Sequence, residues 1–184
     1  MILAVVGPPH SGKTVFLSEV YRYLLVKREI RFFLQRAAPD GEGIWSAESD
    51  QELVKQIRHK YEYTDEFVNH IITSINSLSK NFQLVLIDCG GMITEENRQI
   101  ISNCTHFVII SSNRDAMATW LNFCEEICEC ECVGIFDSLL TSDRSPFFNK
   151  ETLLGLLVGL DRSGVPKETS LVIEQFTNFI ISLL

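Results

Sequence analysis

The sequence predicts an α/β fold in three layers, in which a mostly parallel sheet of about six strands is covered by helices on both faces. Short apolar runs alternate with longer segments whose apolar residues recur at helical spacing. The first apolar run leads directly into a glycine-containing loop and then into a helical pattern. At 184 residues the chain has the length of one such domain, so we expect residues 1–184 to form a single domain.

Strands are expected where apolar residues, many of them β-branched or aromatic, are nearly continuous over a short run. Such runs are typical of parallel strands that are covered on both sides. The expected strands are residues 2–6, 29–35, 82–88, 106–111, 132–136 and 153–160.

Helices are expected where apolar residues return every three or four positions. In residues 65–78 this spacing is carried by Val68, Ile71 and Ile75, and Thr64 is the expected N-cap. The expected helices are residues 14–26, 50–61, 65–78, 94–103, 115–128 and 170–184.

The composition excludes several classes of partner. Charged residues make up 22% of the chain and the net charge is −8, so we expect no electrostatic grip on bulk nucleic acid or on an anionic membrane. No stretch approaches the roughly 18 to 20 apolar residues that a membrane span needs. The opening apolar run is the first expected strand, so we expect no cleavable signal there. These observations predict a cytoplasmic protein with reduced cysteines.

Four cysteines lie close together in the sequence, and they are Cys124, Cys128, Cys130 and Cys132. Their spacing fits no usual zinc pattern, and the residues between them include several glutamates. We therefore expect these thiols to behave as small buried hydrophobic groups.

The loop after the first strand matches the phosphate-binding pattern G-x-x-x-x-G-K-[ST] at every fixed position. Its residues are Gly7, Pro8, Pro9, His10, Ser11, Gly12, Lys13 and Thr14. Glycines let backbone N–H groups point inward at phosphates, Lys13 reaches the β and γ phosphates, and the hydroxyl of Thr14 binds Mg²⁺. The N-terminus of the following helix adds a partial positive charge. The loop therefore predicts binding of a nucleoside triphosphate with Mg²⁺.

The strand expected at residues 82–88 ends in an acid that is followed by two glycines. In phosphate-loop enzymes a strand parallel to the first ends in an acid that holds the Mg²⁺ shell, and we assign this catalytic and metal-binding role to Asp88. The spacing of Asp88 and Gly91 adds a sensor of the γ phosphate, formed by backbone N–H groups near Gly90 or Gly91. The alternative is that Asp88 only caps the following turn.

The loop expected at residues 36–45 follows the second strand, at an edge where open parallel sheets bind ligands. Pro39 and two glycines make it irregular. Asp40 and Glu42 are candidate catalytic residues, because either carboxylate would orient an attacking water or contact a metal. The alternative is a surface turn with solvated acids.

Three segments, residues 7–14, 38–45 and 87–97, recur in an order found in a known family. Together they resemble the phosphate-loop (P-loop) domain fused behind a CRISPR-associated ring nuclease, a protein that degrades cyclic oligoadenylate messengers in type III immunity. The resemblance covers most of the chain and is weakest after Phe136. It implies a kinase-like or ATPase-like nucleotide-binding fold, an accessory role in type III CRISPR defence, and assembly with the nuclease.

One feature of the chain departs from those fusions. Their nuclease domain precedes the phosphate-binding loop, whereas here the first strand begins at residue 2. We therefore assign no ring-nuclease activity to these residues. Either the nuclease partner is a separate polypeptide or the domain works alone, and a homo-oligomer also stays open.

The leading functional hypothesis is a Mg²⁺-dependent NTPase. ATP is favoured over GTP because residues 136–139 lack the N-K-x-D element that guanine specificity usually needs. One alternative is a small-molecule or nucleotide kinase, in which Asp40 accepts a proton from a substrate hydroxyl and Arg36, Arg114 or Arg144 clamps the acceptor. Another is a non-catalytic module that senses nucleotide.

Overall fold

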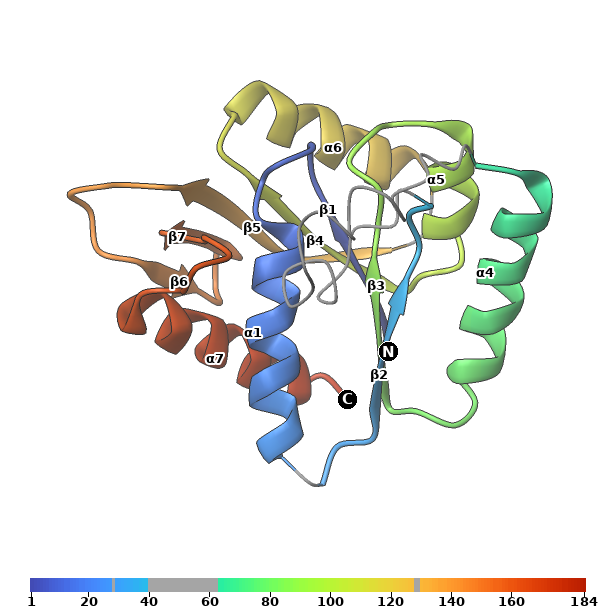
Figure 1. Ribbon diagram of the computed structural model, residues 1–184, viewed down its shortest axis with the longest axis horizontal. Coiled ribbons are helices and arrows are strands. Elements are labelled where there is room, and N and C mark those ends of the chain that lie inside the picture. Colours follow the sequence, from blue (N-terminus) through green and yellow to red (C-terminus); the bar gives the residue numbers. More distant parts are fainter. Residues whose placement is uncertain (28, 40–62, 128–129) are drawn as a thin grey trace.

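The computed structural model describes residues 1–27, 29–39, 63–127 and 130–184 (Figure 1). Within them the sheet has seven strands in the order β2-β3-β1-β4-β5-β7-β6. Every neighbouring pair is parallel except β6 and β7, which are antiparallel. The strands are β1 Ile2–Val6, β2 Phe32–Arg36, β3 Leu84–Asp88, β4 His106–Ser111, β5 Glu131–Leu139, β6 Phe147–Asn149 and β7 Leu154–Val158.

Helices lie on both faces of the sheet, which confirms the predicted three-layer α/β fold (Figure 1). They are α1 Lys13–Val26, α4 Asp65–Leu78, α5 Glu95–Ile101, α6 Arg114–Ile127 and α7 Lys167–Ile181. Helices α1 and α7 pack on one face, and α4, α5 and α6 cover the other. The helix predicted at residues 50–61 lies outside the described residues.

Alternate residues of the central strand enter different halves of the core. Leu3 and Val5 of β1 pack among side chains of α1 and α7, whereas Ala4 and Val6 pack among those of α4, α5 and α6. All five residues of β1 are buried, because side chains of a strand point alternately to the two covered faces. This double coverage explains why the run has no polar position.

Several predicted boundaries were wrong. Among the described residues the sheet has seven strands, one more than the six predicted. The missed strand is β6, which spans only 3 residues at the sheet edge and is too short to show a period. Strand β2 begins at Phe32 rather than 29, and β5 continues to Leu139 rather than 136. Helix α7 begins at Lys167, directly after Pro166, which cannot lie inside a helix without disrupting it.

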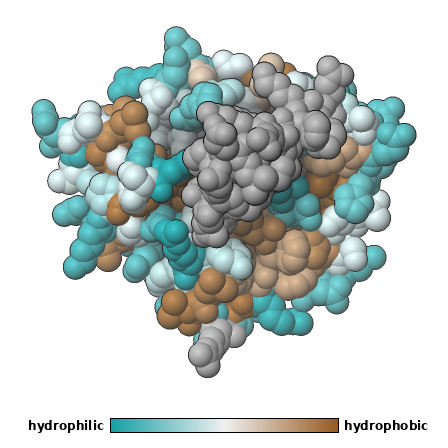
Figure 2. Space-filling view, viewed as in Figure 1, coloured by the Kyte–Doolittle hydropathy of each residue, from teal (hydrophilic) through white to brown (hydrophobic). Residues whose placement is uncertain are grey.

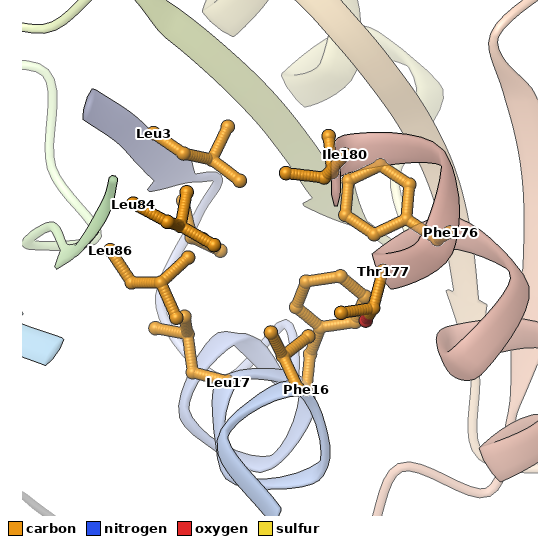
Figure 3. Close-up of a pocket in the computed structure, with 10 residues that line it drawn as sticks. Leu3, Phe16, Leu17, Leu84, Leu86, Phe176, Thr177 and Ile180 are labelled. Carbon is orange, nitrogen blue, oxygen red and sulfur yellow. The ribbon is translucent and has the colours of Figure 1, made fainter. Parts of the chain in front are cut away.

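A small cavity of ≈ 10 Å³ lies where α1 and α7 meet the sheet. Figure 3 shows Phe16 and Leu17 of α1 on one side and Phe176 and Ile180 of α7 on another. Thr177 is the polar side chain of the lining, and its hydroxyl already donates to the carbonyl oxygen of Ile173 at 2.7 Å. Because a buried water needs two to four polar partners, this cavity is an apolar packing void rather than a ligand site.

On the face shown in Figure 2, hydrophobic residues form separate groups among hydrophilic ones. Within the described ranges, none of the helices combines the length and the apolarity that crossing a membrane requires.

Candidate functional site

The predicted phosphate-binding loop leaves the carboxyl end of β1, between β3 and β4. Gly7 has a φ of 138°, and a Cβ at this position would overlap with the carbonyl oxygen of Ile110 at the end of β4. Gly12 has a φ of 90° and is the N-cap of α1. Only glycine enters these backbone conformations without strain, so both glycines are needed to fold the loop tightly over the sheet edge.

The N-terminus of α1 is not closed by side chains. Gly12 makes no side-chain cap hydrogen bond, and the first turn of α1 contains no acidic residue. The first N–H groups of a helix lack intrahelical acceptors and carry a partial positive charge. This end of α1 therefore suits an anion.

Lys13 is the first residue of α1, and its side chain turns back into the loop. Its ammonium donates to the carbonyl oxygens of Gly7 and Pro8, each at 2.8 Å, and the residue is only 8% exposed. Ser11 in the same loop is also buried, and its hydroxyl has no hydrogen-bond partner among the described residues. A buried hydroxyl without a partner is costly, which indicates that the loop is built to receive a polar ligand.

Two predicted magnesium ligands lie side by side. Asp88 ends β3 and is in register with Val5 of the neighbouring β1. The hydroxyl of Thr14 donates to Oδ2 of Asp88 at 3.4 Å, although the two residues are 74 positions apart in the sequence. Hard oxygen ligands of this kind are those that Mg²⁺ prefers. The geometry fits the assignment, and the metal-binding role stays a prediction.

The Gly90–Gly91 turn lies against the phosphate-binding loop. A Cβ on Gly91 would stand 2.7 Å from the nitrogen of Pro9 and 3.1 Å from the carbonyl carbon of Pro8. Neither Gly90 nor Gly91 has a positive φ, so these glycines are required for space rather than for backbone conformation. The turn and the loop are thus in direct backbone contact, as a sensor of bound phosphate requires.

Two site residues were missed by sequence reasoning. Asn97, in the first turn of α5, is buried and donates from Nδ2 to the carbonyl oxygens of Met92 at 2.6 Å and Gly90 at 3.4 Å. The Tyr63 hydroxyl lies 3.1 Å from Oδ1 of Asn97. One signal was available, because the N-cap Thr94 is followed three positions later by asparagine, where a capping box has Glu or Gln.

The structure says less about the remaining candidate residues, which are two acids and three arginines. Asp40 and Glu42 lie outside the described residues. Arg36 ends β2 in register with Asp88, and its Nε donates to the carbonyl oxygen of Ala38 at 3.3 Å. Arg114 begins α6 and is exposed. Arg144 is also exposed, and its Nη2 lies 3.5 Å from Oδ2 of Asp137.

Cys89, next to the site, and Cys124, in the cysteine-rich segment of the sequence, are both buried. Burial is the main cause that raises the pKa of the Cys89 thiol far above its usual value, and the neighbouring Asp88 charge raises it further. Cys89 is therefore an uncharged thiol at neutral pH. Cys124 is buried in the core, while Cys128 lies outside the described residues.

The structure is similar to solved structures over nearly its whole length. One is the septum site-determining protein MinD from Pyrococcus horikoshii complexed with Mg-ADP, with a TM-score of 0.68, 10% identity and coverage of 99% of this chain and 96% of that one. Another is cobyrinic acid a,c-diamide synthase from Mycobacterium smegmatis with bound ADP and magnesium, with a TM-score of 0.65, 12% identity and coverage of 98% and 93%.

A third is a plasmid partition protein from Borrelia burgdorferi, with a TM-score of 0.65, 8% identity and coverage of 100% of this chain and 98% of that one. No protein-family model and no curated protein matches the sequence. At such low identity a similar structure shows the fold alone. The chain therefore has the P-loop NTPase fold of the MinD type.

Proposed function

We propose that this protein is a Mg²⁺-dependent nucleotide-binding NTPase that favours ATP. The observation that carries the proposal is the meeting of three features at one sheet edge: the uncapped N-terminus of α1, the buried Lys13 ammonium, and the contact of Thr14 with Asp88. Two of the similar structures contain ADP with magnesium, which supports the same choice of ligand.

The described residues fit the phosphates of a nucleotide. Backbone N–H groups at the start of α1 and the unpartnered Ser11 hydroxyl are donors that gain an acceptor when a phosphate binds. Lys13 would exchange the carbonyl oxygens of Gly7 and Pro8 for the β and γ phosphates. Each of these contacts stabilises negative charge near the transferred phosphoryl group.

The metal site would be formed by Thr14 and Asp88. Bound Mg²⁺ would supply charge neutralisation at the phosphate oxygens. Asp88 would hold the metal's water shell and Thr14 would bind the metal directly. Asp40 or Glu42 would orient the attacking water, and backbone N–H groups of Gly90 or Gly91 would contact the γ phosphate.

Calorimetry with Mg²⁺ tests the proposal directly. We expect heat on titration with ATP, a smaller response to GTP, and slow release of phosphate from ATP alone. Absence of heat from both nucleotides would show that the phosphate-binding loop is not a nucleotide site. Tight binding with no turnover would select the alternative of a nucleotide-sensing module.

Replacement of Asp88 by asparagine is expected to abolish most of the dependence of ATP affinity on magnesium. The substitution keeps the shape of the side chain but removes its charge, so the metal loses its anionic protein partner. Affinity measured with Mg²⁺ should fall about tenfold towards the value measured with EDTA. Asp143→Asn, at an exposed loop position, is the control and should bind like the wild type. An unchanged response to magnesium in Asp88→Asn would favour the alternative that Asp88 only caps the turn.

Replacement of Asp40 by asparagine is expected to lower turnover by two orders of magnitude or so while sparing nucleotide affinity, because general-base or water-positioning groups contribute about that much. Single-turnover phosphate release and calorimetry on the same variant separate the two effects. Equal loss of turnover and affinity would mean that Asp40 is structural.

A kinase activity is the second candidate, because Arg36 is in register with Asp88 at the edge where an acceptor would bind. The two functions differ in their dependence on an acceptor. An NTPase releases phosphate from ATP and Mg²⁺ alone, whereas a kinase turns over only when its acceptor is added.

The accessory role in type III CRISPR cyclic-oligoadenylate signalling rests on the sequence resemblance. The three similar structures described above are not ring nucleases, so they add no support for it. Gel filtration of the chain mixed with a ring nuclease tests the association, and comparison of ATP turnover with and without that nuclease tests activation. Independent elution and unchanged turnover would remove this role from the proposal.

A further inference from the structure

The side chain of Asn97 has all its hydrogen-bonding groups engaged within the protein. Its Nδ2 faces two carbonyl oxygens, those of Gly90 and Met92, and its Oδ1 faces the Tyr63 hydroxyl. An amide nitrogen only donates and an amide oxygen only accepts. The opposite orientation would place oxygen against two carbonyl oxygens, so the surroundings fix which way the amide points.

The amide is the anchor of the turn that it contacts. Met92 and Ile93 are 66% and 42% exposed, so burial of their side chains does little to hold the turn in place. Asn97 itself is fully buried and is fixed at the start of α5, where its backbone N–H donates to the hydroxyl of the N-cap Thr94 at 3.3 Å. The first turn of α5 thus carries the polar group that holds a turn whose Met92 and Ile93 side chains are exposed.

Tyr63 connects the Asn97 side chain to the segment that follows β2. Its hydroxyl lies 3.1 Å from Oδ1 of Asn97 and 3.4 Å from the carbonyl oxygen of Ala37, which follows β2. A Cβ on Gly90 would overlap with the same hydroxyl and would stand 3.0 Å from Nδ2 of Asn97. The close approach of tyrosine and asparagine therefore accounts for glycine at position 90.

We propose that Asn97 and Tyr63 are positioning residues that hold the Gly90–Met92 turn against the Pro8–Pro9 backbone. In this place the turn is set to distinguish a nucleoside triphosphate from a diphosphate. The inference rests on the proposed function, because it assumes that the neighbouring loop binds nucleotide phosphates. It assigns to two residues outside the loop the control of discrimination between ATP and ADP.

The first measurement uses the protein without nucleotide. Hydrogen–deuterium exchange over residues 88–94 is compared in the wild type, Asn97→Asp and Tyr63→Phe. Asn97→Asp keeps the size of the side chain but removes both donors, so exchange there should rise about tenfold. Tyr63→Phe removes one hydroxyl and should raise it about threefold. Unchanged exchange in both variants would overturn the positioning role whatever the nucleotide results are.

Two matched control variants are available. Tyr23→Phe removes a hydroxyl that donates to Oδ1 of Asn178 at 3.0 Å, which is the same kind of pair between α1 and α7. Asn76→Asp makes the same chemical change as Asn97→Asp at an exposed position of α4. Both should leave exchange over residues 88–94 at the wild-type level. A rise in either control equal to that in the matching variant would show a general loss of stability instead.

The second measurement is the ratio of the affinities for a non-hydrolysable ATP analogue and for ADP. We expect Asn97→Asp to lower this ratio about tenfold, mainly by lowering the affinity for the ATP analogue. The control variants should leave the ratio unchanged. A wild-type ratio in a variant whose turn exchanges faster would overturn the discriminating role. Binding of neither nucleotide by the wild type would instead contradict the proposed function, and the discriminating role would fall with it.

A compensating pair tests the contact itself. Gly90→Ala alone should speed exchange over residues 88–94, because its methyl group overlaps with the Tyr63 hydroxyl. Adding Tyr63→Phe to Gly90→Ala removes that hydroxyl and should restore part of the protection. Purely additive effects of the two substitutions would show that residues 63 and 90 are not coupled, and would contradict the proposal.

Discussion

Replacement of Lys13 by alanine is expected to lower the affinity for Mg-ATP about 100-fold and turnover by at least as much. A charge-assisted hydrogen bond contributes about 1.5–3 kcal/mol, and every 1.4 kcal/mol is a tenfold change in affinity. Lys13 is buried at the N-terminus of α1 with its ammonium inside the loop, so the substitution removes a positive charge from the place where phosphates would bind. Calorimetry gives the affinity, and phosphate release gives the turnover.

Lys27→Ala is the matched control for this prediction. Lys27 is the C-cap of the same helix, and its ammonium lies 5.1 Å from the centre of the Tyr23 ring. The control should bind Mg-ATP like the wild type. Because Lys13 also donates to the loop in the free protein, urea unfolding of Lys13→Ala is measured as well. Wild-type affinity and turnover in a folded Lys13→Ala protein would refute the assignment of the site.

Replacement of Gly7 by alanine is expected to lower the free energy of unfolding by roughly 3 kcal/mol or more. The φ of 138° is strained for a residue with a side chain, at a cost of about 1–3 kcal/mol. The added methyl group would also overlap with the Ile110 carbonyl oxygen, which is backbone and cannot rotate away. Overpacking of this kind adds about 1–3 kcal/mol. Urea unfolding followed by circular dichroism measures the change.

Gly164→Ala separates the two causes of this loss. Gly164 has a similar φ of 153°, but a Cβ there would meet nothing within 4 Å. Its substitution should therefore show the backbone strain alone, at about 1 kcal/mol. Equal losses for Gly7→Ala and Gly164→Ala would mean that the loop yields to the methyl group and that its close approach to β4 is not rigid.

Regular elements could be predicted from the sequence where several local signals agreed. The helix expected at residues 65–78 is α4, Asp65–Leu78, and Thr64 caps it by accepting a hydrogen bond from the N–H of Phe67. Here the apolar period, the N-cap and two acidic residues in the first turn indicate the same start. Strands β1 and β4 also have the predicted bounds, because both are apolar on both faces.

Other parts of the fold depend on contacts that a single sequence does not display. Strand β6 forms because Phe147–Asn149 pairs with β7, and 3 residues give no period that would indicate this pairing. Its middle residue, Phe148, packs in a group of rings that includes Phe136 and Phe176. This packing is tertiary, so propensity and pattern alone do not reveal it.

The candidate site also has features that the sequence indicates and contacts that it does not. The loop pattern and the acid at the end of β3 could be recognised because phosphate and Mg²⁺ chemistry restricts which residues serve there. The contact of Asn97 with Tyr63 could not, because these residues are 34 positions apart in the sequence and only the folded chain brings them together. The roles of Asp40 and Glu42 stay predictions, since both lie outside the described residues.

The uncapped N-terminus of α1 couples the binding of a ligand to the stability of the fold. In the free chain, its first N–H groups have no capping side chain, and the Ser11 hydroxyl has no protein acceptor. A ligand that satisfies these donors binds the folded state and not the unfolded one. By mass action it raises the stability by about 2.7 kcal/mol when its concentration is 100 times its dissociation constant. A rise in the thermal midpoint on addition of Mg-ATP would therefore report occupancy of this loop.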